Sequence, residues 1–209
     1  MNNLAEKIKN YTQEDYANNK IDLHIHTVLS DGHGDCRQIL KSAKEKGYEL
    51  ISITDHNTAE VHYHIQDEIL ITGVEFDCWF GYVYVHLLAY GVDINNEEFR
   101  EFLAKDKHGT DHVLPRLLIY RNVKKLISAI HNAGGIAVLA HPACCWALNL
   151  ERMIKKLMEF GLDGVEVYYP YSRFRGVIKF HSAQTVKKIA DKYPNLIQTG
   201  GTDFHGEVF

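Results

Sequence analysis

Short apolar runs alternate with longer amphipathic stretches through most of the chain. In the first part, this pattern predicts a strand at residues 21–25, a helix at 36–46, and strands at 50–54 and 69–74. Strands that alternate with helices are typical of a parallel sheet covered by helices, either open or closed into a barrel. In both architectures the functional side chains gather at the carboxyl ends of the strands.

The same alternation returns in the second half of the chain. There the pattern predicts helices at 122–132, 150–160 and 182–192, and strands at 136–140, 164–168 and 196–200. The expected fold class is therefore α/β.

Two stretches between these halves follow a different pattern. Residues 75–90 are rich in aromatic and β-branched residues with Gly81 among them, which predicts a hairpin or two short strands. Residues 92–120 are polar and irregular, and we interpret them as an excursion or lid insertion.

The N-terminal residues 1–20 form a third distinct stretch. Leu4, Ile8 and Tyr11 recur at helical spacing in a polar context, which predicts a short amphipathic helical extension outside the core. No repeat, low-complexity tract or linker interrupts the sequence, so we expect one domain over residues 1–209.

Composition narrows the class of protein. With 45% hydrophobic and 24% charged residues, the chain has the make-up of a globular protein and not of a disordered one. The net charge of −4 argues against a stable nucleic-acid partner. Four cysteines without a C-x-x-C pair, and the absence of an apolar leader, favour the cytoplasm. No apolar run has the roughly 18 residues of a membrane span.

The unusual number is 13 histidines, and many of them follow the predicted strands. His24 and His26 lie two residues apart in the first strand, so both side chains point to one face and can chelate one ion. The other ligand-type side chains at or near strand ends are Asp31, His56, Glu75, His86, His141, Asp203 and His205.

Nine such side chains exceed the three or four that one zinc ion needs. They suffice for two or three ions, with a carboxylate such as Glu75 bridging neighbouring ions. Mixed imidazole and carboxylate ligands suit zinc, manganese or iron better than a metal that prefers thiolates.

Six segments in order carry a family resemblance: IDLHIHTVLSDG, ISITDHNT, GVEF, VHLLAYG, AGGIAVLAHP and GGTDFH. They resemble the successive motifs of the PHP (polymerase and histidinol phosphatase) family of metal-dependent phosphoesterases. The resemblance implies a distorted (β/α)7 TIM-like barrel with a trinuclear metal centre at its C-terminal face. The centre would hold two or three divalent metal ions, which would be Zn, Mn, Fe or Mg.

The resemblance also implies which residues hold each ion. The first ion would have His24, His26, Glu75 and Asp203, and the second Asp31, His56 and His205. The third would have Glu75, His86 and His141, with Glu75 as the bridge. Asp31 stands where some members have histidine, and this variant is similar to the branch that acts on nucleotide-like phosphomonoesters.

The ions imply the chemistry. A water that bridges two cations becomes a hydroxide near neutral pH, and it would attack phosphorus while the ions hold the phosphate oxygens. Among the ligands we expect His56, Glu75, Asp203 and His205 to be catalytic. Asp22 and Asp55 are predicted to accept hydrogen bonds from ligand N–H groups and so fix their tautomers.

Other residue groups allow two interpretations each. Arg173 and Arg175 could bind a substrate phosphate or be solvated surface arginines. Cys144 and Cys145 are expected to be inert. The remaining histidines are expected to be ordinary polar side chains: His33, His62, His64, His108, His112, His131 and His181.

The sequence thus predicts a phosphoric ester hydrolase that acts on a small phosphate monoester. A nucleotide-like compound is the favoured substrate. The alternatives within enzymes are a histidinol-phosphate phosphatase, a nuclease that trims oligonucleotide ends, and an amidohydrolase. Glu75, His86 and the Asp203/His205 pair fit the last class poorly. A non-catalytic regulatory PHP module is the alternative outside enzymes.

Overall fold

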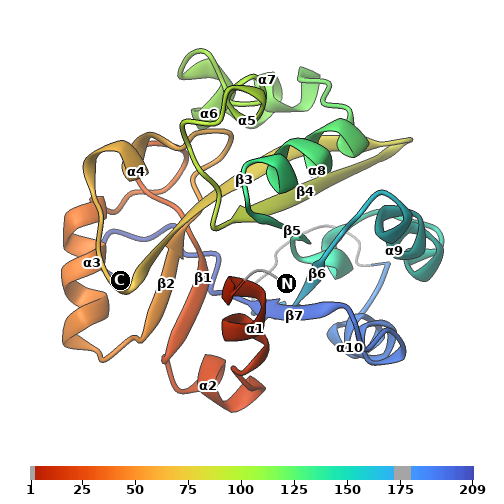
Figure 1. Cartoon of the computed structure of the whole chain (residues 1–209), viewed down its shortest axis with the longest axis horizontal. Coiled ribbons are helices and arrows are strands. Elements are labelled where there is room, and N and C mark those ends of the chain that lie inside the picture. Colours follow the sequence, from red (N-terminus) through yellow and green to blue (C-terminus); the bar gives the residue numbers. More distant parts are fainter. Residues whose placement is uncertain (1–2, 172–179) are drawn as a thin grey trace.

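Seven strands form one curled sheet in the computed structural model, which describes residues 3–171 and 180–209 (Figure 1). The strands follow one another around the sheet in chain order: β1 (Ile21–Ile25), β2 (Leu50–Ile53), β3 (Leu70–Phe80), β4 (Val83–Tyr90), β5 (Ile136–Leu139), β6 (Gly164–Tyr168) and β7 (Ile197–Gly200). The chain after β7 meets β1 through an isolated parallel bridge between Ile25 and Phe204. The curled α/β sheet agrees with the barrel-like architecture that the resemblance implied.

Helices lie on the outside of this curl (Figure 1). In chain order they are α1 (Asn3–Lys9), α2 (Gln13–Ala17), α3 (Cys36–Glu45), α4 (Glu60–His64), α5 (Glu97–Arg100), α6 (His108–Asp111), α7 (Val113–Leu118), α8 (Val123–Asn132), the 3-10 turn η1 (Pro142–Cys144), α9 (Leu150–Glu159) and α10 (Ala183–Lys192). Side chains cap most of the longer ones; Asp35, for example, accepts the backbone N–H of Arg37 at the start of α3. None of the described helices combines the length and hydropathy that crossing a membrane requires.

The sheet is parallel at its two flanks and antiparallel in its centre. β1, β2 and β3 pair in parallel, as do β5, β6 and β7, whereas β4 runs antiparallel to both of its neighbours. The predicted strand at 69–74 and the predicted hairpin are therefore one feature, because β3 continues to Phe80. Gly81 supplies the positive φ, +62°, for the tight turn into β4.

The N-terminal extension differs from its prediction. It forms two short helices, and α1 packs against the sheet instead of lying outside the core. Ile8 is fully buried and joins a cluster with Leu23, Tyr90 and Val138. The hydrophobic side of α1 is only a few residues wide, so the sequence pattern showed a helix but not what the helix covers.

The excursion at 92–120 contains α5, α6 and α7, which group together beyond β3 in Figure 1. Phe99 of α5 is fully buried and packs edge-on against Phe76 of β3. The Trp79 indole N–H donates to the carbonyl of Leu117, which attaches α7 to the same strand. A lid function for this segment stays a prediction, as does the assignment of the whole chain to one domain.

We expect Ile8→Ala to lower the free energy of unfolding by about 2 to 5 kcal/mol, because it removes a fully buried side chain and leaves a cavity. Urea unfolding measures the change. Lys7→Ala in the same helix is the control, since Lys7 is exposed and should alter stability by no more than about 0.5 kcal/mol. Equal effects of the two variants would contradict the burial of α1.

Candidate metal centre

The nine predicted ligands converge at one end of the curled sheet. His24 lies in β1, Glu75 in β3 and His86 in β4. The others lie in segments that follow strands: His26 and Asp31 after β1, His56 after β2, His141 after β5, and Asp203 with His205 after β7. Strands in chain order around a curled sheet bring these ends together although the residues span most of the chain.

Glu75 is at the middle of the cluster and is 1% exposed. Its two oxygens lie within 3.3 Å of one ring nitrogen from each of five histidines: His24, His26, His56, His86 and His141. Oε2 faces the first three of these rings and Oε1 the last two. This is the arrangement that a carboxylate bridging neighbouring ions needs.

The first predicted ligand group is assembled. Nε2 of His24 and Nε2 of His26 lie 3.1 Å apart. Asp203 Oδ1 is 3.4 Å from the first and 3.3 Å from the second. Both rings are fully buried, so this group lies at the closed floor of the site.

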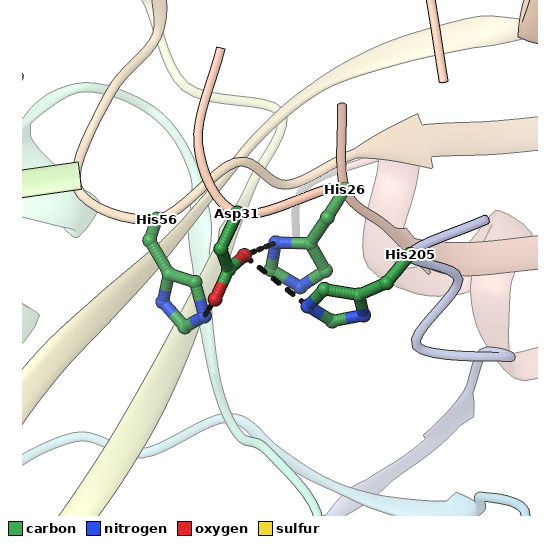
Figure 2. A group of neighbouring side chains, drawn as sticks. All are labelled: His26, Asp31, His56 and His205. Carbon is green, nitrogen blue, oxygen red and sulfur yellow. Dashed lines mark ion pairs between the residues drawn. The ribbon is translucent and has the colours of Figure 1, made fainter. Parts of the chain in front are cut away.

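The second group gathers around Asp31, as Figure 2 shows. Its carboxylate is 3.2 Å from His205 Nε2 and 3.6 Å from His56 Nε2. His26 also belongs here, because its Nδ1 is 3.6 Å from Asp31 Oδ1. The resemblance placed His26 with the first ion alone, whereas in the structure its ring borders both groups.

The third group lies on the other side of Glu75. His86 Nδ1 and His141 Nε2 are 3.2 Å apart, and Glu75 Oε1 is 2.8 Å from the first and 3.1 Å from the second. His56, Glu75 and His86 also bring ligand atoms within 4.8 Å of one another. The structure therefore allows His86 to join His141 or His56 around an ion.

This donor set fits divalent cations. His24 Nδ1 lies 3.0 Å from Glu166, so its Nε2 is left facing another ring nitrogen and two carboxylates. Such a concentration of acceptors in a buried place is unfavourable without positive charge. Imidazole nitrogen and carboxylate oxygen are ligands of zinc, manganese and iron.

The pKa shifts of the rings express the same demand for positive charge. Burial by itself lowers the pKa of His26, but Asp203 and Glu75 outweigh it and raise the pKa to about 10. Against its burial, Glu75 and Asp77 raise the pKa of His86 to about 10. His56 behaves in the opposite way: burial lowers its pKa to about 3, and the charges of His26 and His86 add to that effect.

Local backbone conformation also marks the site. Asp203 has φ +50° and His141 has φ +27°, a region that residues with a side chain rarely adopt. Gly201 allows the chain after β7 to pass close to β1, because a Cβ there would lie 2.3 Å from the Cβ of His24. These conformations place the Asp203 carboxylate against His24 and His26.

The predicted roles of Asp22 and Asp55 are wrong in detail. Asp22 is buried and accepts the backbone N–H of His24 and of Thr202. Asp55 is buried as well and accepts the N–H and hydroxyl of Thr27 and the hydroxyl of Ser30. Neither carboxylate is paired directly with a ligand ring; both hold the segments that carry the ligands, and Asp55 reaches His26 Nδ1 only through Ser30 Oγ.

Two other carboxylates lie beside the rings, and the sequence reasoning missed both. Glu166 of β6 lies 3.0 Å from His24 Nδ1 and accepts the backbone N–H of His141. Asp77 of β3 lies 3.1 Å from His86 Nε2. The available signal was the period of two, which puts Asp77 on the same face of its strand as Glu75.

Two further contacts to the ligands come from residues that gave no sequence signal. Tyr169 donates its hydroxyl to Asp203 Oδ2 at 2.7 Å. Arg116, from the excursion, places its Nη1 2.9 Å from Asp31 Oδ2 and is 4% exposed. Both depend on how distant segments fold over the site.

The remaining predicted residues have different outcomes. Arg173 and Arg175 lie outside the described residues, so their contact with phosphate stays a prediction. Cys145 is buried, and burial raises the pKa of its thiol to about 12, in accord with an inert cysteine. His62 is a structural residue whose Nε2 lies 2.9 Å from the carbonyl of Ile53.

A comparison with known protein families shows which family this chain belongs to. A model of the PHP domain matches residues 22–199. The chain belongs to the PHP domain family. The interpretation drawn from the six motifs is therefore confirmed, and with it the class of metal-dependent phosphoric ester hydrolases.

Individual relatives are similar over most of the chain. This chain is 31% identical over 189 residues to the uncharacterized protein MJ1587 of Methanocaldococcus jannaschii. The aligned region covers 83% of this chain and 95% of the relative. This chain is also 22% identical to phosphoribosyl 1,2-cyclic phosphate 1,2-diphosphodiesterase of Eggerthella lenta, over 89% of this chain and 94% of that protein.

A solved structure shows the same fold. It is that of a candidate metal-dependent phosphoesterase from Bifidobacterium adolescentis, with a TM-score of 0.71 and 21% sequence identity. The match covers 90% of this chain and 88% of the other chain.

The ring pKa values predict that protons and metal ions compete in this PHP domain. A histidine whose pKa is raised in the fold stabilises it while protonated, fully below about pH 6.5, the ordinary pKa, and this stability is lost as pH rises. For His26, His86 and His141, with pKa values of about 10, 10 and 9, the loss falls between about pH 6.5 and 10.

We therefore expect the melting temperature of the metal-free protein to fall over that pH range, and saturating zinc or manganese to abolish the fall. Metal binding at pH 7.5 should release protons, because ligand nitrogens must be unprotonated. Calorimetry in two buffers with different ionisation enthalpies measures the release. Binding without proton release would contradict the competition.

Proposed function

We propose that the protein hydrolyses a small phosphate monoester and that its preferred substrate is nucleotide-like. The reaction would use two or three divalent ions held by the nine converged side chains. The observation that carries the proposal is the position of Glu75, whose two oxygens face five imidazole nitrogens in a buried site. Membership of the PHP family supports the same reaction class.

The burial of the ligands gives the site a floor and a rim. His24, His26 and Glu75 are at most 1% exposed, whereas the side chains of Asp31, Asp203 and His205 are 22%, 20% and 37% exposed. A substrate would therefore approach across the rim. Bound divalent ions would supply a water of lowered pKa and hold phosphate oxygens against developing charge.

The proposed catalytic residues follow from this division. Glu75 and His56 would hold ions from the floor, where water is excluded and electrostatic interactions are strong. Asp203 and His205 would hold them from the rim, and the Tyr169 hydroxyl keeps the Asp203 carboxylate in place. Arg116 is a cation beside Asp31, and Arg173 and Arg175 are proposed to contact the substrate phosphate.

The nucleotide-like substrate is the finer part of the proposal. It is supported by Asp31 in the second ligand group and by the name of the E. lenta relative, which describes a phosphorylated sugar with a cyclic phosphate. A small substrate, no stable nucleic-acid partner and a cytoplasmic location remain parts of the proposal.

We expect the purified protein, reconstituted with manganese or zinc, to release phosphate from p-nitrophenyl phosphate. His56→Ala should lower kcat/KM by more than the about 10–100-fold that loss of an outer partner of a ligand typically costs. His64→Ala is the matched control, since His64 is exposed and pairs with Glu60 on the surface. Cys145→Ala should also change little.

The same assay tests the proposal as a whole. Absence of both bound metal and hydrolysis after reconstitution would overturn it and favour a non-catalytic module. Activity lost in Cys145→Ala but kept in His56→Ala would overturn the assignment of the site.

A substrate panel tests the finer part. We expect mononucleotides or 3′,5′-bisphosphonucleosides to give the highest kcat/KM, above histidinol phosphate, a five-membered cyclic sugar phosphate and a 5′-phosphorylated oligonucleotide. Preference for histidinol phosphate, the cyclic diester or the oligonucleotide would instead identify the corresponding alternative.

A further inference from the structure

Asp77 is a buried carboxylate at the edge of the proposed metal centre that the ligand set does not include. It lies two residues after Glu75 on β3, and in the antiparallel register it is directly opposite His86 of β4. Asp77 is 0% exposed to solvent. A buried carboxylate is retained only where donors compensate its charge, so its partners indicate its role.

Three donors contact the two oxygens of Asp77, and two further nitrogens face it without a hydrogen bond. Oδ1 lies 3.1 Å from His86 Nε2 and accepts the hydroxyl of Tyr84. Oδ2 accepts the side-chain amide of Asn57 and faces two further groups, His56 Nδ1 at 3.6 Å and Arg116 Nε at 3.5 Å. With so many donors directed at it, the side chain acts as an acceptor only.

The His86 ring lies between two carboxylates. Its Nε2 faces Asp77, and its Nδ1 is 2.8 Å from Glu75 Oε1. A neutral imidazole has one N–H and one lone pair. Because Asp77 is an acceptor, the N–H belongs on Nε2, and the lone pair of Nδ1 then points to the Glu75 side.

The same carboxylate faces the outer side of a second ring. His56 directs Nδ1 toward Asp77 and Nε2 toward Glu75, at 3.6 Å and 3.3 Å. His56, Glu75 and His86 are one of the groups whose ligand atoms lie close enough to share an ion. Asp77 therefore borders both histidines of one group and neither ring of the group formed by His24, His26 and Asp203.

Glu166 occupies the corresponding place on the opposite side of the site. It lies 3.0 Å from His24 Nδ1 and accepts the backbone N–H of His141. The two carboxylates come from different strands, β3 and β6, and contact different histidines. Their effects on separate ions can thus be separated by substitution.

We propose that Asp77 is a positioning residue that fixes the tautomer of His86, so that Nδ1 of His86 joins Glu75 and Nε2 of His56 in holding one ion. The proposal rests on the metal centre proposed above. It assigns opposite ligand atoms to two histidines of one site: Nδ1 in His86, and Nε2 in His56.

The experiment compares Asp77→Asn with Tyr84→Phe and wild type. Each protein is titrated with Co²⁺, with visible absorption and bound-metal content as readouts, after circular dichroism has verified folding. We expect Asp77→Asn to weaken one Co²⁺ site by about 10–100-fold and alter its absorption band, while the other ions bind as before.

Tyr84→Phe is the matched control. It removes a different donor from the same carboxylate and keeps the aromatic ring that packs edge-on against His86, so its Co²⁺ affinities should stay within about threefold of wild type. Folded Asp77→Asn with wild-type Co²⁺ affinities and spectrum would overturn the proposal. A wild-type protein that binds no Co²⁺, Mn²⁺ or Zn²⁺ would instead overturn the metal centre itself.

A measurement on the wild type keeps the proposal testable if Asp77→Asn does not fold. Nitrogen-15 NMR of the histidine rings in the Zn²⁺-loaded protein should show the proton of His86 on Nε2 and that of His56 on Nδ1. A proton on Nδ1 of His86 would overturn the assignment.

Discussion

The structure of the site depends on one buried carboxylate, that of Glu75, and on the five imidazole nitrogens that face it. A lone carboxylate in this position would be costly to remove from water. The compensating rings come from β1 and β4 and from the segments after β1, β2 and β5. Every other feature of the site serves to bring those elements to this one point or to set which ring atom faces it.

The curl of the sheet provides the convergence. In a flat sheet the ends of β1 and β7 would be far apart, whereas here the Ile25–Phe204 bridge joins the two edges. That closure brings Asp203 and His205 to His26 and Asp31. The central antiparallel hairpin does the same for the other side, because its register sets His86 against Asp77 and within reach of Glu75.

A surplus of acceptors gives the site its affinity for cations. Three ligand carboxylates and the ring nitrogens leave more lone pairs than N–H groups at the centre, and the raised pKa values of His26, His86 and His141 follow from this imbalance. Divalent ions would satisfy the same lone pairs with greater charge. The buried floor strengthens this preference, because a low dielectric increases the attraction between ion and ligand.

The sequence by itself determined the kind of site and most of its members. Strand periodicity placed His24 and His26 on one face, and the rule of strand ends gathered the remaining ligands, since both depend only on local geometry. The family motifs then grouped them. The α/β class followed from the alternation of apolar runs with amphipathic stretches, and the curl of the sheet followed from the family resemblance.

Only the tertiary structure decided how each side chain is held. Ile8 closes part of the core, His26 borders two ligand groups, and Asp77 and Glu166, instead of Asp22 and Asp55, face the rings. Arg116 reaches Asp31 from 85 residues away. These contacts depend on strand register, sheet curl and the path of the excursion, and no local pattern of apolar and polar residues encodes which distant atom a ring nitrogen will meet.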